Sequence, residues 1–400
     1  MSEEESRYSQ RGVSSTKAEV HAATKELDQG IFPGAFCKIL PDHLGHDPRW
    51  CNIQHSDSAG TKSSLAYLVW KLTGNLEVWK GIIRDSLFMN LDDAGSVGCM
   101  GPFLVSLTIG RNKALIPGEI IKVLIEGCQE VCDFLTDWDI PCHFSGGETA
   151  DIGDLVRTIT VDNTITARMW RSRVVDASKI KPPAFIVGFS STGKARWESE
   201  PNSGIGSNGL TNARHDTLAP DYRVHTETFS PETPSDLIYC GEFHISNPLP
   251  GDERFTIGSA LLSPTRTYLP LIYKIIRNVG IGYILGIFHC SGGGQTKIGK
   301  FGKSGIVYLK DNLFPVPPLF QMLQRVHDLP WREMYSTYNM GHRLEMVVRT
   351  EKIANECIAI SQWYGIEAKI IGTIVPNPEN QTSRRVLIKS EYGEFSFVDL

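Results

Sequence analysis

Several short segments of this 400-residue sequence place carboxylates, hydroxyls or glycines where they would suit phosphate and metal chemistry. The first is Asp57-Ser-Ala-Gly60-Thr61-Lys62, which follows a strand-like run and enters a helical one. A carboxylate can hold a hard cation such as Mg²⁺, and a glycine before a helix lets backbone N–H groups approach phosphate oxygens. The segment does not meet the Walker pattern, so a surface turn with a helix cap is the alternative.

Two further segments carry acids beside apolar residues or glycines. Asp92 and Asp93 follow Met89-Asn90-Leu91, and a metal ion would compensate such adjacent acids at less cost than the burial of two free charges. An exposed turn is an equally good interpretation of this segment. Gly146-Gly147-Glu148 would place a carboxylate at the end of a strand, where it suits a metal or nucleotide contact, with a plain hairpin turn as the alternative.

Two glycine-rich segments predict a close approach of the backbone to a ligand. Residues 203–209, Ser-Gly-Ile-Gly-Ser-Asn-Gly, feed a helical run, so free N–H groups and the helix dipole would favour an anion there. Arg214 would add a charge-assisted bond to a phosphate, and a flexible loop is the alternative. Gly292-Gly293-Gly294, after His289, would also permit close approach.

The elements that must position these segments include both strand and helix patterns. Strand patterns occur at residues 51–56, 158–161, 164–167, 184–189, 368–375 and 385–389. Helical patterns occur at residues 64–72, from Pro117 to Leu135, and at 351–364, which Gly365 would cap. The class is therefore α/β or α+β. A composition change near residues 179–183 predicts domains at 1–176 and 177–400, and residues 219–256 form a long excursion.

Composition and charge argue against several classes of protein. A net charge of -5 without a Lys/Arg cluster gives no basic surface for nucleic acid or for a membrane. No stretch reaches the roughly 18 apolar residues of a spanning helix, and the acidic start at residues 1–6 is no signal or transit peptide. Nine cysteines without a C-x-x-C pair predict a reduced cytoplasmic location and no structural zinc, with Cys128 and Cys132 as core packing.

In their order along the chain, these segments resemble the motifs of phosphoribosylformylglycinamidine cyclo-ligases, or AIR synthetases. Residues 57–62 resemble the family's Asp-Gly-Val-Gly-Thr-Lys, residues 92–93 its Asn-Asp, and residues 146–150 its Gly-Gly-Glu-Thr-Ala. Residues 207–209 match the end of its Ser-Gly-Pro-His-Ser-Asn-Gly loop. The similarity continues through Leu262–Tyr268, His289–Gly294 and Met334–Gly341, and it runs from about residue 8 to 374.

The resemblance implies a two-domain fold, with an N-terminal α+β domain that dimerises through its sheet and a C-terminal α/β domain. It implies ATP as co-substrate, Mg²⁺ as cofactor, and closure of formylglycinamidine ribonucleotide to aminoimidazole ribonucleotide in purine biosynthesis, with release of ADP and phosphate. The implied catalytic residues are Asp57, Lys62, Asp93 and Glu148, of which Asp57, Asp93 and Glu148 would hold the metal. The nucleotide would lie on Gly60, Thr61, Lys62, Asp92, Asp93, Gly146, Gly147 and Glu148. The substrate phosphate would lie on Ser207, Asn208, Gly209 and Arg214, and Lys38 is a second cation that could offset phosphate charge.

Several positions depart from the family pattern. Asp92 stands where the family has Asn, Gly206 where it has His, and residues 340–342, Met-Gly-His, replace Cys-Gly-Val. One alternative is therefore a paralogous ATP-dependent enzyme of selenophosphate synthetase or thiamine monophosphate kinase type. Cys37-Lys38 is similar to the Cys-Lys of the former, whereas residues 262–268 and 334–341 favour the cyclo-ligase. A non-catalytic nucleotide-binding regulator is the other alternative, against which stands the joint retention of Asp57, Lys62, Asp93 and Glu148.

Overall fold

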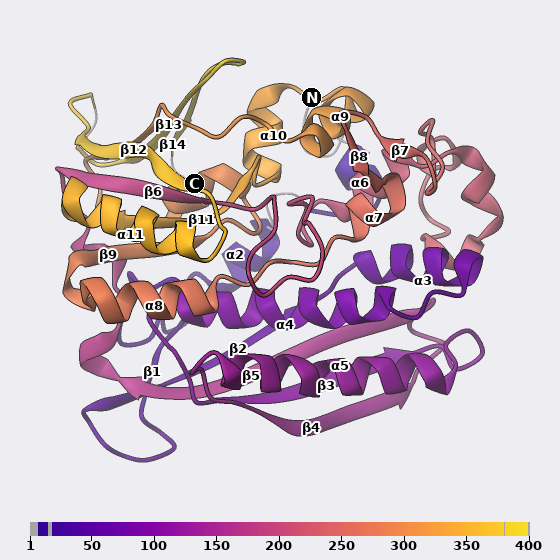
Figure 1. The fold of residues 1–400 in the computed structure, drawn as a ribbon, viewed down its shortest axis with the longest axis horizontal. Helices are drawn as coiled ribbons and strands as arrows, with labels where there is room; N and C mark the ends of the chain where they lie inside the picture. Colours follow the sequence, from indigo (N-terminus) through magenta and orange to yellow (C-terminus); the bar gives the residue numbers. More distant parts are fainter. Residues whose placement is uncertain (1–6, 15–17, 380, 399–400) are drawn as a thin grey trace.

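The computed structural model describes residues 7–14, 18–379 and 381–398, and two sheets dominate it (Figure 1). The five-stranded sheet is formed between residues 40 and 170, and the seven-stranded sheet between residues 184 and 398. The domain boundary predicted at residues 176–177 falls in the connection between the two sheets. The acidic residues 1–6, on which the argument against a signal peptide rested, lie outside the described part of the chain.

The five-stranded sheet has the strand order β1-β2-β5-β3-β4, and only the β3–β4 pair is parallel. Its strands are β1 (Leu40–Pro41), β2 (Trp50–Ser58), β3 (Phe103–Arg111), β4 (Cys142–Asp151) and β5 (Ile159–Trp170). Alternate residues of β5 are buried, as the two-residue period of a strand requires when one face is covered. The two strands expected at 158–161 and 164–167 are therefore one.

Helices cover one face of this sheet. α4 (Val78–Ser96) and α5 (Gly118–Asp137) lie on the same side of it in Figure 1. α5 begins after Pro117, as predicted, and its Cys128 and Cys132 are buried in the core. α3 (Lys62–Thr73) precedes α4 and packs against it. The residues of β5 that point away from these helices are half-buried or exposed.

The seven-stranded sheet has the strand order β14-β13-β10-β12-β6-β11-β9. Its strands are β6 (Ala184–Ser190), β9 (Ile284–His289), β10 (Ile306–Lys310), β11 (His342–Val348), β12 (Ala368–Pro376), β13 (Arg384–Ser390) and β14 (Gly393–Val398). Every residue of β9 and β11 is buried, which is the pattern of strands covered on both faces. α8 (Leu269–Val279) and α11 (Glu351–Trp363) pack together beside it, and Gly365 follows α11 at φ +73°.

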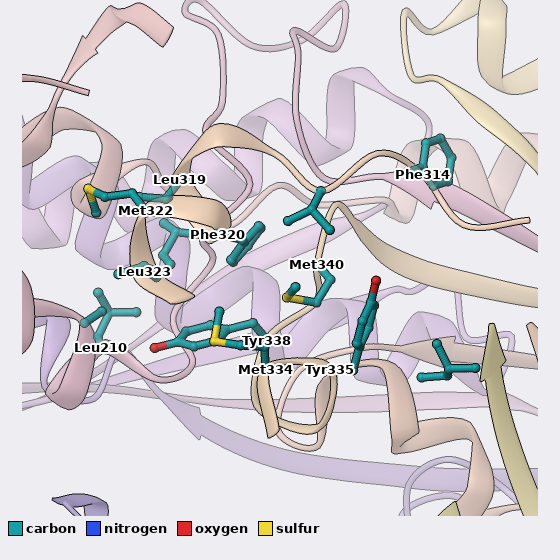
Figure 2. Packing of buried hydrophobic residues seen from close by; sticks show 14 of the residues in the cluster. Leu210, Phe314, Leu319, Phe320, Met322, Leu323, Met334, Tyr335, Tyr338 and Met340 are labelled. Carbon is teal, nitrogen blue, oxygen red and sulfur yellow. The ribbon is translucent and has the colours of Figure 1, made fainter. Parts of the chain in front are cut away.

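The remaining elements complete the second half. They are α6 (Leu210–Thr217), α7 (Ile257–Leu262), α9 (Pro318–His327), α10 (Trp331–Thr337), β7 (Pro248–Leu249) and β8 (Asp252–Thr256). Figure 2 shows their core, in which Phe320 of α9 and Met334 of α10 lie near Tyr338 and Met340. The excursion at 219–256 is built from 3₁₀ turns and the β7–β8 pair. At the N-terminus lie α1 (Arg7–Gln10) and α2 (Ala18–Thr24).

α4 lies between the two sheets and forms the junction of the molecule (Figure 1). Every residue from Asp85 to Ser96 is buried, so the segment with Asp92 and Asp93 is the interior of a helix. The exposed turn considered for this segment is therefore wrong. Among the described helices, none is long and apolar enough to cross a membrane.

Candidate functional site

The centre of the candidate site is a pair of carboxylates that two different elements bring together. Asp57 lies near the end of β2, and Asp93 lies in the last two turns of α4. Burial raises the pKa of Asp57, and the negative charge of Asp93 raises it further. Two close carboxylates repel each other unless one is protonated or a cation lies between them. The pair therefore has the character of a divalent-cation site.

A chain of hydrogen bonds from the second sheet orients Asp93. The Nδ1 atom of His289, at the end of β9, lies 2.8 Å from Oδ1 of Asp93. Arg343 donates from Nε to Nε2 of His289 at 2.9 Å. Because Nε2 accepts this bond, the proton of a neutral ring is on Nδ1, from which it is donated to Asp93. Burial lowers the pKa of His289, which favours the neutral ring.

His55 approaches the same carboxylate from the first sheet. It lies two residues before Asp57 on β2, so both side chains project from one face of the strand. Its Nε2 atom is 3.6 Å from Oδ2 of Asp93, and its Nδ1 atom is 2.7 Å from Oδ1 of Asn90. Asn90 in turn donates to the backbone carbonyl of Asn163 in β5. These contacts fix the end of α4 against the sheet that carries Asp57.

Lys62 lies away from this pair, which corrects the expectation that it neutralises the nucleotide phosphates. Its side chain is fully buried, and its ammonium contacts Oδ1 of Asp85 at 3.0 Å. It also donates to the carbonyl oxygens of Gly206 at 2.9 Å and Ser263 at 2.6 Å. Three acceptors use all three N–H groups of a lysine. Lys62 is a fixed cation that joins α3 and α4 to the second half of the chain.

Asp92 also turns away from the carboxylate pair. Its Oδ1 atom accepts from Oγ1 of Thr267 at 2.7 Å, and its Oδ2 atom from the backbone N–H of Tyr268 at 3.0 Å. Neighbouring residues of a helix point about 100° apart, so Asp92 and Asp93 face different partners. Burial raises the pKa of Asp92 to about 7. The predicted nucleotide contact of Asp92 is therefore replaced by a contact that holds the start of α8.

Glu148 does not join Asp57 and Asp93 within one chain. Gly146-Gly147-Glu148 lies inside β4, not at a strand end or in a hairpin turn, and Glu148 is exposed. Its strand pairs with β3, β3 pairs with β5, and β5 pairs with β2, so three strand spacings, or about 14 Å, separate β4 from β2. A Cβ at Gly147 would lie 1.7 Å from the carbonyl oxygen of Leu107, so the glycine serves the β3–β4 pairing.

The glycine-rich loop at residues 203–209 meets the turn after β2. Oγ of Ser207 donates to the carbonyl of Ala59 at 2.8 Å, and the Oγ1 atoms of Thr61 and Thr211 lie 2.8 Å apart. Gly60 is exposed at the turn, and Ser207, Asn208 and Gly209 are half-buried. The structure therefore places the first and fourth segments of the sequence analysis side by side. Gly209 precedes α6 at φ +74°.

The side chain of Arg214 contacts residues 228 and 239 of the excursion, and not the glycine-rich loop where the sequence suggested a substrate-phosphate contact. It is buried, and its Nη1 atom donates to the carbonyl of Thr228 at 2.6 Å and to the hydroxyl of Tyr239 at 2.9 Å. Both partners belong to the excursion at residues 219–256. Arg214 therefore anchors the excursion to α6. Lys38 also contacts a group outside the carboxylate pair, because its half-exposed ammonium lies 3.5 Å from Oδ2 of Asp28.

Comparisons with known proteins give the relatives of this chain. No family model matches it. The phosphoribosylformylglycinamidine cyclo-ligase of Methanocaldococcus jannaschii is 29% identical over 296 residues, which cover 74% of this chain and 72% of the relative. The cyclo-ligase of Desulfotalea psychrophila is 26% identical over 400 residues, which cover 96% and 97% of the two chains. The chain is therefore similar along most of its length to phosphoribosylformylglycinamidine cyclo-ligases.

Solved structures share the fold expected for the cyclo-ligase family. A chain of the HypE–HypF complex aligns with a TM-score of 0.52 and 15% identity, and the alignment covers 96% of this chain and 98% of that one. AaThiL complexed with AMPPCP and TMP aligns with a TM-score of 0.50 and 12% identity, over 95% and 96%. These similarities confirm the predicted two-domain AIR-synthetase-like fold.

Within the cyclo-ligase pattern, three residues of the site received no role from the sequence. They are His55, His289 and Arg343, which surround Asp93. His289 had a signal, because it opens the segment that ends in Gly292-Gly293-Gly294. Arg343 directly follows the departure at Met340-Gly341-His342, and only the fold shows that it reaches Asp93 through His289.

Proposed function

We propose that this chain converts formylglycinamidine ribonucleotide and ATP to aminoimidazole ribonucleotide, ADP and phosphate, as a cytoplasmic ligase of purine biosynthesis. The observation that carries the proposal is the pair of half-buried Asp57 and buried Asp93 at the junction of the two halves, in a chain similar to cyclo-ligases over most of its length. In this reaction the formyl oxygen of the substrate takes the terminal phosphoryl group of ATP. A substrate nitrogen then attacks the activated carbon, and phosphate leaves as the ring closes.

Asp57 and Asp93 fit a Mg²⁺ ion. Both are oxygen donors, and their mutual repulsion is the property that a bound cation would relieve. Mg²⁺ is usually bound through one or two carboxylates together with water and substrate phosphates, and Asp57 and Asp93 would supply the carboxylates. When bound, such an ion would neutralise charge on the triphosphate. Glu148 is not part of this set in a single chain.

The chain's own residues supply position and orientation. His289 holds Asp93 in one orientation, and Asn90 fixes His55 beside it. The loop at residues 203–209 and the glycines 292–294 offer backbone N–H groups close to this corner, since Gly292 lies beside the side chain of Asn208. Ring closure is an intramolecular step, so its rate depends mainly on how well the reacting atoms are held together.

We also propose that the protein is a homodimer that pairs through the open face of the five-stranded sheet. Thr166 in the central strand β5 points away from α4 and α5, and it pairs with Gln54 of β2 and Leu104 of β3. Leu104 is 50% exposed on this face. A second copy on this face would cover it.

One observation bears on the selenophosphate synthetase alternative. Burial raises the pKa of Cys37 far above the ordinary value of a thiol. A cysteine acts as a nucleophile through its thiolate, so a buried, protonated thiol is poorly suited to a transfer role. Cys37 is therefore better explained as part of the core beside Ile39. The cyclo-ligase relatives point the same way.

The test is a reaction with purified protein, ATP, Mg²⁺ and formylglycinamidine ribonucleotide. ADP release should require the ribonucleotide, and one aminoimidazole ribonucleotide should form for each ADP, as measured by diazotisation and coupling. Omission of the ribonucleotide is the control for contaminating ATPase activity. ADP formed on another small substrate, without the aminoimidazole product, would support the paralogue. Nucleotide binding without turnover on any substrate would support the regulator.

A further inference from the structure

Arg343 of β11 fills the space beside the glycine-rich loop that a side chain at residue 206 would need. Gly206 has φ +67°, and a Cβ built on it would lie 1.2 Å from Nη1 of Arg343. The side chain beside the loop at Gly206 therefore comes from β11, and it brings a permanent positive charge.

In the guanidinium of Arg343, Nε donates a hydrogen bond, whereas Nη2 has no partner among the described residues. Nε donates to His289, which in turn donates to Asp93, so the charge lies two hydrogen bonds from the acid pair. Arg343 is 1% exposed, and its Nη2 atom is buried with no hydrogen-bond partner among the described residues. A buried charged donor without a partner is rare in folded proteins and marks a place for a missing acceptor.

A second unpaired polar atom belongs to the glycine-rich loop itself. Oδ1 of Asn208 is also buried without a partner in the described part of the chain, two residues from Gly206. By contrast, the fixed cation Lys62 has all its donors in use, one of them on the carbonyl of Gly206. Arg214, the other arginine considered for this loop, donates to the excursion. Nε of Arg214 is also buried without a partner in the described part of the chain, but Arg343 is the arginine whose guanidinium lies against Gly206 of the loop.

We propose that Arg343 binds a phosphate-type oxygen of the ligand between the glycine-rich loop and Asp93, in a role that the sequence gave to Arg214. The inference deepens the proposed function and rests on it for the identity of the ligand. Arginine suits the role because its planar fork can hold His289 through Nε and a phosphate oxygen through Nη. Lysine has the charge but cannot hold both partners in fixed directions.

The experiment compares Arg343→Gln and Arg343→Lys with the wild type and with Arg214→Lys. Arg214→Lys is the control, because it replaces the guanidinium of a buried arginine whose hydrogen bonds go to Thr228 and Tyr239 of the excursion. Calorimetry measures the affinity for inorganic phosphate, and kinetics give kcat and the Michaelis constants of ATP and the ribonucleotide. Loss of one charge-assisted bond predicts a fall of about 10- to 150-fold in phosphate affinity for Arg343→Gln. Arg343→Lys should lose less, and Arg214→Lys should match the wild type.

The two substrates reveal the source of the phosphate group. A rise in the Michaelis constant of ATP would assign Arg343 to the terminal phosphate of the nucleotide, and a rise for the ribonucleotide would assign it to that substrate's phosphate. Either result supports the inference. Unchanged phosphate affinity and kinetics in a folded Arg343→Gln would overturn it. If Arg343→Gln does not fold, Arg343→Lys is the test. Phosphate affinity of Arg343→Lys equal to that of the wild type would then overturn the inference.

Failure of the proposed function would look different. A wild-type protein that binds phosphate through Arg343 but forms no aminoimidazole ribonucleotide would disprove the reaction and leave the anion site intact. A wild-type protein that forms the product, with Arg343 variants that match it in every measurement, would disprove the role of Arg343 alone.

Discussion

Asp57 and Asp93 oppose each other in the free protein, and this opposition predicts how their variants behave. Burial and the charge of Asp93 both raise the pKa of Asp57, so an amide at residue 57 relieves a conflict. Asp57→Asn should therefore keep or raise the urea midpoint of unfolding, while the affinity for Mg-ATP falls at least tenfold by calorimetry. Asp154→Asn, at an exposed acid elsewhere, is the matched control. Unchanged nucleotide affinity in both Asp57→Asn and Asp93→Asn would refute the assignment.

The sequence identified the segments of the site better than the directions of their side chains. Asp57 and Asp93 interact through their charges, whereas Lys62, Asp92 and Arg214 lie in the expected segments but contact other partners. Side-chain direction in a helix changes by about 100° per residue, and which direction meets a partner depends on the packing of distant elements. Arg343 shows the same limit, because its approach to Gly206 exists only once β11 is in the sheet.

At the scale of elements, the ion pair between α3 and α4 makes the second prediction. Lys62 and Asp85 are both fully buried, so removal of one partner leaves the other charge unpaired. Lys62→Met should lower the free energy of unfolding by about 3–5 kcal/mol, measured by urea denaturation. The double variant Lys62→Met/Asp85→Leu should lose clearly less than the sum of the single variants. A stable Lys62→Met with weakened ATP binding would instead restore Lys62 to the nucleotide.

Helices with one apolar face were predictable, whereas α4, which is buried on nearly all sides, was not. The start of α5 at Pro117 and the end of α11 before Gly365 follow from apolar spacing and from end signals. α4 gave no such pattern, because both sheets cover it and its polar residues find partners inside the molecule. Its Asp92 and Asp93 were therefore equally compatible with an exposed turn. The interior position of Gly147 in β4 depends on the neighbouring strand and has no local signal.

At the scale of the whole molecule, Asp216 ties the N-terminal segment to α6 and α9. It accepts hydrogen bonds from Arg11 and from Nδ1 of His327, the latter at 2.6 Å. Burial raises the pKa of Asp216, but the bonds from His327 and Arg11 outweigh burial and hold it well below its usual value. The ionised group thus stabilises the fold above the unfolded pKa of about 3.9, and this contribution is lost as pH falls further.

The third prediction is a pH dependence that follows from this carboxylate. Asp216→Asn should lower the free energy of unfolding by about 3–5 kcal/mol at pH 7, because Arg11 keeps a buried charge without its partner. The difference from the wild type should stay constant down to about pH 5 and narrow below about pH 4. Urea midpoints at several pH values measure it, with Asp154→Asn as control. A difference that grows on acidification would contradict the sign.

The fourth prediction concerns the open face of the five-stranded sheet. Thr166→Arg places a charge at the centre of the face on which a second copy is proposed to pack. Burial of that charge without a partner should convert the dimer to a monomer, as measured by light scattering after size exclusion. Gln129→Arg adds the same charge on the exposed side of α5 and should leave the dimer intact. A Thr166→Arg protein that stays dimeric would place the interface elsewhere.

Two backbone amides of the second half donate their hydrogen bonds to α4, so their deuterium exchange reports on the contact between the two halves. Thr265 donates its N–H to Asp85, and Tyr268 donates its N–H to Asp92, so neither amide is protected by a neighbouring strand. Their exchange with deuterium therefore requires separation of the second half from α4, without unfolding of either sheet. A nucleotide that bridges Asp93 and the glycine-rich loop should slow exchange at residues 265 and 268, with amides inside β5 unchanged. Slower exchange at these two amides would then show that ligand binding reduces separation of the second half from α4.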